Sequence, residues 1–190
     1  MCCLKKNYLV DYDRYFINYN YDPTDNESKK LIKCATGGKC ELEENKIGYY
    51  LNSGYEEIIT IGTPEQTPRK RNTETSTVFT QLISCTENEI CTSVSSESST
   101  TLKEGHYADA SGATEATINE IKVTTYAGLI ICSKGDIDED IISCKKENDV
   151  VDGYYFDASK EMNDEVSYEG LIKCSNSESS CVLEIPKDGM

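Results

Sequence analysis

The ten cysteines are the residues of this 190-residue chain with the clearest chemical potential. Structural zinc sites use paired C-x-x-C ligands or several histidines, but the chain has no such pair and its single histidine is His106. Disulfide bonds in an oxidising compartment are therefore the better interpretation. We predict pairing between near neighbours, which gives Cys34–Cys40, Cys85–Cys91, Cys132–Cys144 and Cys174–Cys181. Pairing between repeats stays open, and Cys2 and Cys3 receive no assigned partner.

The other chemistry-bearing residues do not form a reactive constellation. A catalytic histidine needs a nucleophile and an orienting acid, and nothing near His106 supplies them. Asp136, Asp138 and Asp140 have the spacing of the first three ligands of a calcium loop, but Ile141 stands where the loop needs glycine. They are a weak metal candidate, and a solvated acidic turn is the simpler interpretation. We expect a non-enzymatic protein without a cofactor.

Composition narrows the class of protein and of partner. Apolar residues make up 37% of the chain, below the roughly 45–50% of globular domains, which argues against one deep core. The formal net charge of −15 disfavours nucleic acid as a partner. The longest apolar run, residues 126–132, is too short to span a bilayer. We expect a secreted, extracellular segment of a longer chain, because the repeats begin and stop partway.

Two short motifs recur in a fixed order along the chain. Leu-Ile-x-Cys begins at residues 31, 82, 129 and 171, and each copy is followed by a second cysteine. The second motif, the Tyr element Gly-Tyr-Tyr, follows at residues 48 and 153, and Gly-His-Tyr stands at residue 105. Arg-Tyr-Phe-Ile-Asn at residues 14–18 is a degenerate copy of the same element. The sequence therefore predicts one repeat array over 1–190, with repeats at 31–81, 82–128 and 129–170 and partial repeats at about 1–30 and 171–190.

Each repeat offers about three short β-prone runs and no helical pattern of useful length. The sequence thus predicts an all-β repeat protein stapled by disulfides. We favour a parallel β-solenoid whose coils stack strand on strand, with loops of variable length between the Tyr element and the next Leu. Tandem small antiparallel β-modules, one per repeat, are the alternative.

The tyrosine pairs suggest a surface. Adjacent side chains in a strand point to opposite faces, so one ring of each pair should enter the core and the other should face outward. The expected outward set is Tyr15, Tyr49, His106 and Tyr154. Stacking would align these side chains into a ladder. The ladder is either packing between coils or a partner-binding stripe, since tyrosine is favoured at protein interfaces.

The repeated order Gly-Tyr-Tyr, Leu-Ile-x-Cys, Cys resembles the repeats of scaffoldins from anaerobic gut fungi, across nearly the whole chain. The resemblance implies cohesin-like repeats that bind the dockerin modules of plant-cell-wall hydrolases in a cellulosome outside the cell. Contact with plant polysaccharide would then be indirect. The chain departs from the pattern at His106 and in its longer Cys132-to-Cys144 gap. A carbohydrate-binding or adhesive cell-surface repeat protein is the alternative function.

Overall fold

The chain folds as an all-β protein, as the sequence predicts. The computed structural model describes residues 13–21, 30–62, 73–86, 90–96, 101–118, 120–135, 139–147, 149–160, 170–176 and 180–184. These residues form sixteen strands, β1 to β16, and two three-residue 3₁₀ helices, η1 (Ser53–Tyr55) and η2 (Ala110–Gly112). Within these ranges, no helix has the length and apolar character needed to cross a membrane.

The repeat unit is a three-stranded antiparallel sheet, which we call a module. In each module the Tyr-element strand pairs with the Leu-Ile-x-Cys strand, and that central strand pairs with the strand of the second cysteine. The strands are β1 (Arg14–Ile17), β2 (Leu31–Cys34) and β3 (Cys40–Glu43) in module 1; β4 (Gly48–Leu51), β7 (Leu82–Cys85) and β8 (Cys91–Val94) in module 2; β9 (Gly105–Ala108), β12 (Leu129–Lys134) and β13 (Ile142–Glu147) in module 3; and β14 (Gly153–Phe156), β15 (Leu171–Ser175) and β16 (Ser180–Glu184) in module 4.

A parallel β-solenoid is not confirmed by this arrangement. Every strand pair among the described residues is antiparallel, and parallel contacts are limited to isolated bridges. The connections explain why. The two cysteines of a module are 6 to 12 positions apart in the sequence, which suits a hairpin, whereas a pair of parallel strands needs a long crossover connection. The alternative of small antiparallel modules fits the sheets. Each module begins at its Tyr element. The repeat boundaries expected from the sequence at residues 82 and 129 therefore lie inside a sheet.

All four disulfides predicted from near-neighbour pairing are present. They join Cys34 to Cys40, Cys85 to Cys91, Cys132 to Cys144 and Cys174 to Cys181. In every module the two cysteines are directly opposite each other in the hairpin register. Closing a loop of this size contributes roughly 2–3 kcal/mol in the chain-entropy model. Cys2 and Cys3 lie outside the described residues.

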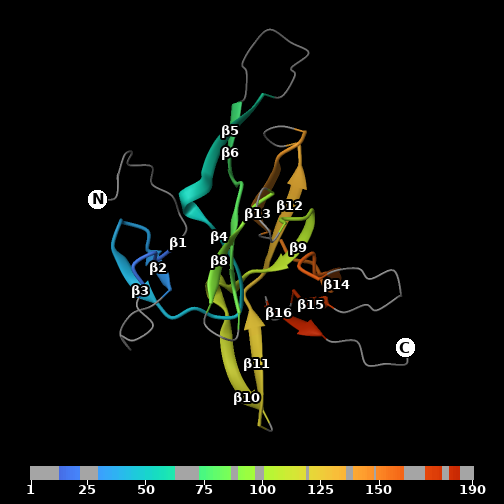
Figure 1. Ribbon diagram of the computed structural model, residues 1–190. Helices are drawn as coiled ribbons and strands as arrows, with labels where there is room; N and C mark the ends of the chain where they lie inside the picture. Colours follow the sequence, from blue (N-terminus) through green and yellow to red (C-terminus); the bar gives the residue numbers. More distant parts are fainter. Residues whose placement is uncertain are drawn as a thin grey trace.

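Two long insertions form hairpins that connect neighbouring modules. β5 (Glu56–Gly62) and β6 (Thr73–Phe79) leave module 2, and β6 joins the sheet of module 3 through β13. β10 (Thr114–Ile118) and β11 (Ile121–Tyr126) leave module 3, and β11 joins the sheet of module 4 through β16. The two hairpins extend in opposite directions from the centre of the molecule (Figure 1).

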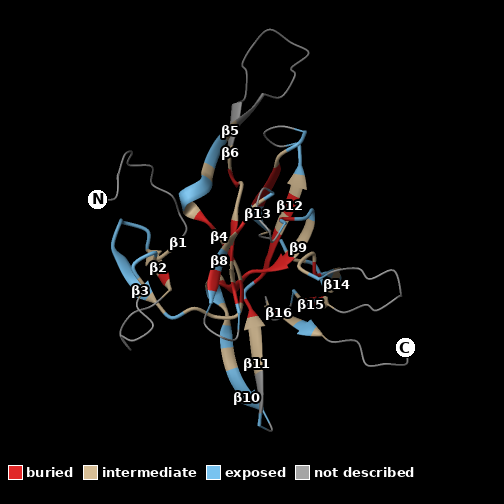
Figure 2. Cartoon of the chain, in the orientation of Figure 1, coloured by how far each residue is buried: buried red, intermediate tan, exposed pale blue. Residues whose placement is uncertain are grey.

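The hydrophobic core is shared between modules. The larger cluster takes buried residues from all four modules, and the smaller one lies between modules 2 and 3. Neighbouring residues of the central strands enter different clusters, since Leu82 and Ile83 point to opposite faces. The larger cluster receives Leu31, Ile83, Leu129 and Ile172, one residue from each module in turn. Burial is accordingly concentrated in the centre of the molecule (Figure 2).

The glycine that opens the Tyr element lets the next module approach closely. Gly48 and Gly105 have φ values of 131° and 133°, which side-chain-bearing residues rarely adopt. A β-carbon on Gly48 would lie 2.8 Å from Cε1 of Tyr126, and one on Gly105 would lie 2.9 Å from Cβ of Ala158. Tyr126 lies in the insertion of the module that follows Gly48, and Ala158 lies just after the Tyr-element strand of the module that follows Gly105.

Replacement of this glycine should therefore be costly. We expect Gly105→Ala to lower the free energy of unfolding by about 2–4 kcal/mol, because backbone strain adds to the clash with Ala158. Gly37→Ala is the matched control, because Gly37 has a φ of 99° but nothing within 4 Å of its added β-carbon. It should cost only about 1 kcal/mol. Urea unfolding with the disulfides intact measures both, and equal losses would contradict the close approach.

Candidate functional site: the aromatic joints between modules

The predicted tyrosine ladder lies at the joints between successive modules. The first aromatic side chain of one Tyr element packs against the second aromatic side chain of the next. The ring centroids are 4.9 Å apart for Tyr15 and Tyr50, 4.8 Å for Tyr49 and Tyr107, and 4.8 Å for His106 and Tyr155. Tilted or edge-on aromatic pairs at such distances are favourable. The same contact therefore recurs at each of the three joints.

The exposure of the ladder residues differs from the outward stripe that the sequence suggested. Tyr15 is only 3% exposed, so the expectation that it faces outward is wrong. Tyr49 and His106 are half-buried, and Tyr154 is 59% exposed. Adjacent side chains of the Tyr element point to opposite faces, as predicted. The face that points away from its own module packs against the following module. Packing between repeats is therefore the interpretation of the ladder that the geometry favours.

Each joint also holds a buried Asn or Asp that the sequence analysis did not single out. Asn52, Asp109 and Asp157 form isolated parallel bridges with Tyr15, Tyr49 and His106 of the preceding module. A side-chain oxygen of each accepts a hydrogen bond from the backbone N–H two residues later, at 3.2, 2.9 and 2.9 Å. This bond turns the chain after the Tyr element. The signal in the sequence was Asn or Asp four residues after the glycine.

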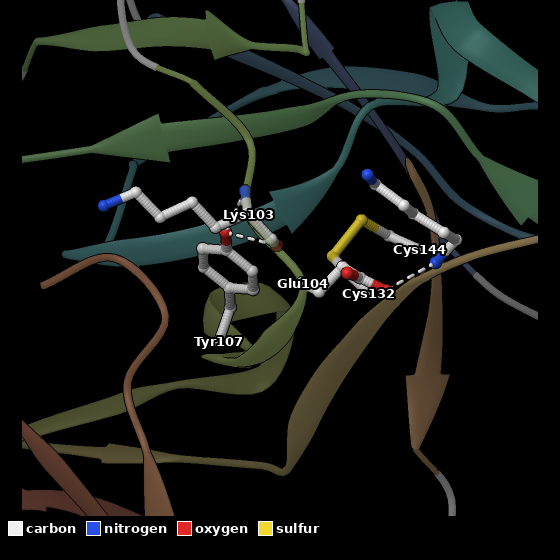
Figure 3. Close-up of a disulfide and its surroundings, with 6 residues drawn as sticks. Lys103, Glu104, Tyr107, Cys132 and Cys144 are labelled. Carbon is white, nitrogen blue, oxygen red and sulfur yellow. Dashed lines mark hydrogen bonds between the residues drawn. A yellow bond between two sulfur atoms is a disulfide. The ribbon is translucent and has the colours of Figure 1, made fainter. Parts of the chain in front are cut away.

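The second tyrosine of each pair anchors the segment that precedes its own strand. The hydroxyl of Tyr107 donates to the carbonyl of Lys103 and accepts from its N–H, both at 2.9 Å (Figure 3). Tyr50 makes the same two bonds with Lys46, at 3.2 and 2.8 Å. The hydroxyl of Tyr155 donates to the carbonyl of Val151 at 2.9 Å. Beside Tyr107, the N–H of Lys134 donates to the Glu104 carboxylate at 3.0 Å.

Burial keeps the tyrosine and histidine side chains of the joints uncharged. It raises the pKa of Tyr107 and of Tyr126 to about 12, and it raises the pKa values of Tyr15 and Tyr50 as well. It lowers the pKa of His106, although the Glu147 carboxylate opposes this change. At neutral pH these groups are therefore poor proton donors and acceptors. The joints are suited to packing, and acid–base chemistry is disfavoured there.

One charged pair lies within the second joint. The Asp109 carboxylate is almost fully buried, and Nζ of Lys146 lies 2.7 Å from its Oδ2. The same ammonium donates to the Ser111 hydroxyl at 3.1 Å. Because Lys146 is partly exposed, only its removal would leave a buried charge, the Asp109 carboxylate, without its partner, which is destabilising. The pair therefore fixes the start of the module 3 insertion against β13.

The acidic segment and the surface hollows offer little chemistry. Asp136 and Asp138 lie outside the described residues, and Asp140 is exposed. In the part of the chain that the structure describes, no three metal-ligating side chains come together. A cavity of about 260 Å³ lies where modules 3 and 4 meet, and Lys146, Glu147 and Asp149 contribute to its lining. Ligand pockets usually measure about 300–1,000 Å³, so this hollow is a weak candidate.

Comparison with known proteins finds no matching family model, no matching curated protein and no matching solved structure. The resemblance to scaffoldins therefore depends on the sequence motifs alone.

The first ring of a Tyr element should contribute to stability where the following module packs against it. We expect Tyr49→Ala to lower the free energy of unfolding by about 2–4 kcal/mol, because Tyr49 packs against Tyr107 and the smaller core cluster. Tyr154→Ala is the matched control at the same repeat position, and its exposed ring should change stability by less than about 0.5 kcal/mol. Urea denaturation of the two oxidised variants compares them. Similar losses in both would argue against the joint.

The buried tyrosines should also make the fold sensitive to alkali. Their pKa values are higher in the folded state than the unfolded value of about 10, so the stabilisation is complete below pH 10. It is lost as the pH rises from about 10 through 12, because only the unfolded state releases these protons readily. Phenolate absorbance should show the exposed tyrosines titrating first and the buried ones together with unfolding. A single titration near pH 10 in a protein that stays folded would contradict this.

Proposed function

We propose that the chain is a non-catalytic extracellular scaffold segment whose cohesin-like modules bind dockerin modules of plant-cell-wall hydrolases in a fungal cellulosome. The observation that carries the proposal is the repeated joint between modules. A protein that makes the same contact three times, around a shared core, is built to hold similar units in fixed relative positions. Fixed display of several docking units is what a scaffold requires.

The partner surface that fits this role best is the pair of projecting hairpins. β5 and β10 are the outer strands of their sheets, so each presents an edge to a partner. Ile58 on β5 and Ile118 on β10 are both more than half exposed. An exposed edge strand with apolar side chains is a ready surface for strand addition by a partner. We therefore place dockerin contact on the hairpins, since Tyr15, Tyr49 and His106 are engaged in the joints.

The disulfides support a location outside the cell. Four disulfides persist only where the surroundings are oxidising, as in the secretory pathway and the extracellular space. Their hairpins also replace part of the apolar core that the composition lacks.

A pull-down from the secretome of a cellulose-degrading anaerobic fungus tests the proposal. The immobilised, oxidised chain should capture dockerin-bearing hydrolases, and mass spectrometry should identify the dockerin as their shared part. The chain alone should not be retained on cellulose. Retention on cellulose without captured hydrolases would overturn the scaffold proposal in favour of a carbohydrate-binding or adhesive protein.

Variants of the hairpins test the contact surface. Ile58→Asp and Ile118→Asp should each reduce capture of dockerin-bearing enzymes at least tenfold, because a carboxylate would be buried without a partner at the contact. Ile90→Asp is the control, because Ile90 is equally exposed but lies in a disulfide-closed turn of module 2. Unchanged capture by both hairpin variants would exclude the hairpins as the docking surface.

A further inference from the structure

The third joint, between modules 3 and 4, takes its first ring from a histidine. Tyr15 and Tyr49 hold this position at the first and second joints, whereas His106, the single histidine of the chain, holds it at the third. A phenol stays neutral over the physiological pH range, but an imidazole gains a proton near pH 6.5. We propose that the third joint is sensitive to pH, and that protonation of His106 in mildly acidic surroundings loosens module 4 from module 3.

The His106 ring is held between the two modules. It is half-buried, and its centroid lies 4.8 Å from that of Tyr155 on β14, with the two ring planes inclined at 57°. Its main chain is fixed at the same place, because the N–H of Ala158 donates to the His106 carbonyl at 2.9 Å and His106 forms a parallel bridge with Asp157. A charge on the imidazole therefore forms inside the joint.

The module 3 side of the joint gives an imidazolium little compensation. In the sheet register His106 is opposite Ile131, and Ile131 is opposite Lys145, so an apolar side chain and a second cation share its row. Glu147 is two residues beyond Lys145 on the same face of β13, and its carboxylate favours the protonated ring. The lysine and the glutamate of β13 thus act on His106 in opposite directions.

The module 4 side adds a neutral ring and a carboxylate that is already bonded. Tyr155 packs against the imidazole, and the buried Asp157 carboxylate accepts from the N–H of Ser159 at 2.9 Å. Lys173 and Glu184 lie on the opposite face of the module 4 sheet from Tyr155, where they pair with each other at 3.3 Å. Among the described residues, His106 therefore forms no ion pair.

Burial decides the direction of the response. It disfavours the charged imidazolium and lowers the pKa of His106 in the docked state, and the attraction of Glu147 only reduces this change. Glu104, two residues before His106, is exposed, and its carboxylate accepts from the N–H of Lys134 at 3.0 Å. Because the folded pKa lies below the unfolded value of about 6.5, the contribution of His106 to docking is complete above that pH. It is lost as the pH falls through the folded pKa.

Loosening at His106 should be partial, because module 4 has other contacts with the preceding modules. Ile172 and Cys174 enter the larger core cluster, and β16 pairs with Thr125 and Tyr126 of β11. The short β11–β16 pairing links module 4 to the projecting hairpin of module 3. Acid should therefore lower the protection of module 4 and of this hairpin together, while the disulfide of module 4 stays closed.

A proton NMR titration of the oxidised chain gives the first test. Because His106 is the single histidine, its imidazole signal is assigned without a variant. We expect the midpoint of this titration to lie below pH 6.5. A midpoint at or above that pH would overturn the proposal, because the docked state would then favour the charged ring.

Hydrogen exchange measured by mass spectrometry locates the loosening. Between about pH 7.5 and about pH 5, after correction for the intrinsic exchange rate, the protection of β14 and β15 should fall at least threefold. Protection should return when the sample is brought back to the higher pH. In module 1, β1 and β2 pack against a joint of two tyrosines and should change less.

His106→Tyr is the matched control variant, because tyrosine stands at the same position in modules 1, 2 and 4. The variant should keep module 4 protected at the lower pH, and any loss that remains measures the carboxylates alone. His106→Phe provides a second ring without a titratable group and should behave like His106→Tyr. An equal acid loss in the unaltered chain and in both variants would overturn the proposal. Constant protection of β14 and β15 in the unaltered chain would do so as well.

Discussion

The contact between one ring of a module and the other ring of the next is the interaction on which the rest of this structure depends. It sets the distance between neighbouring modules, because the centroids of the paired rings are 4.8–4.9 Å apart at every joint. At the second and third joints the opening glycine, Gly48 or Gly105, is too crowded to carry a side chain, whereas Arg14 holds this position at the first joint. At all three joints the Asn or Asp of the next module forms a bridge with the backbone of the residue that carries the first ring. The ring pair and the Asn or Asp residue thus form one contact unit spread over two repeats, and the crowded glycine adds to it at the second and third joints.

The joint also explains how a chain with few apolar residues forms a core. A single module has three short strands and a disulfide, which is too little apolar surface to fold alone. Adjacent residues such as Leu82 and Ile83 serve different clusters, so each sheet has apolar side chains on both faces. Modules 2 and 3 therefore depend on both of their neighbours. This is the nearest-neighbour coupling of repeat proteins, reached here with antiparallel sheets and covalent hairpins.

Much of this could be read from the sequence, for physical reasons that differ by element. The disulfides were predictable because cysteines a few residues apart in β-prone runs have a hairpin between them. The strands and their alternation followed from the short apolar runs around residues 31, 82, 129 and 171. The sheet topology could not be predicted from the sequence, because a regular repeat of three strands fits both one coil of a parallel solenoid and an antiparallel meander. The burial of Tyr15 was missed because a side chain that leaves its own sheet can still enter a neighbour's core.

The two strands of each projecting hairpin hold different positions in the array. The inner strand of each hairpin joins the sheet of the following module, at Phe79 opposite Cys144 and at Tyr126 opposite Cys181. The outer strand has no such duty and lies at the sheet edge. The outer strands make ion pairs with earlier parts of the chain, Glu56 with Arg14 and Glu115 with Lys46, while the inner strands and the joints hold the modules in place. In the scaffold proposed above, substitutions on the outer strands would change recognition and leave the spacing of the modules unchanged.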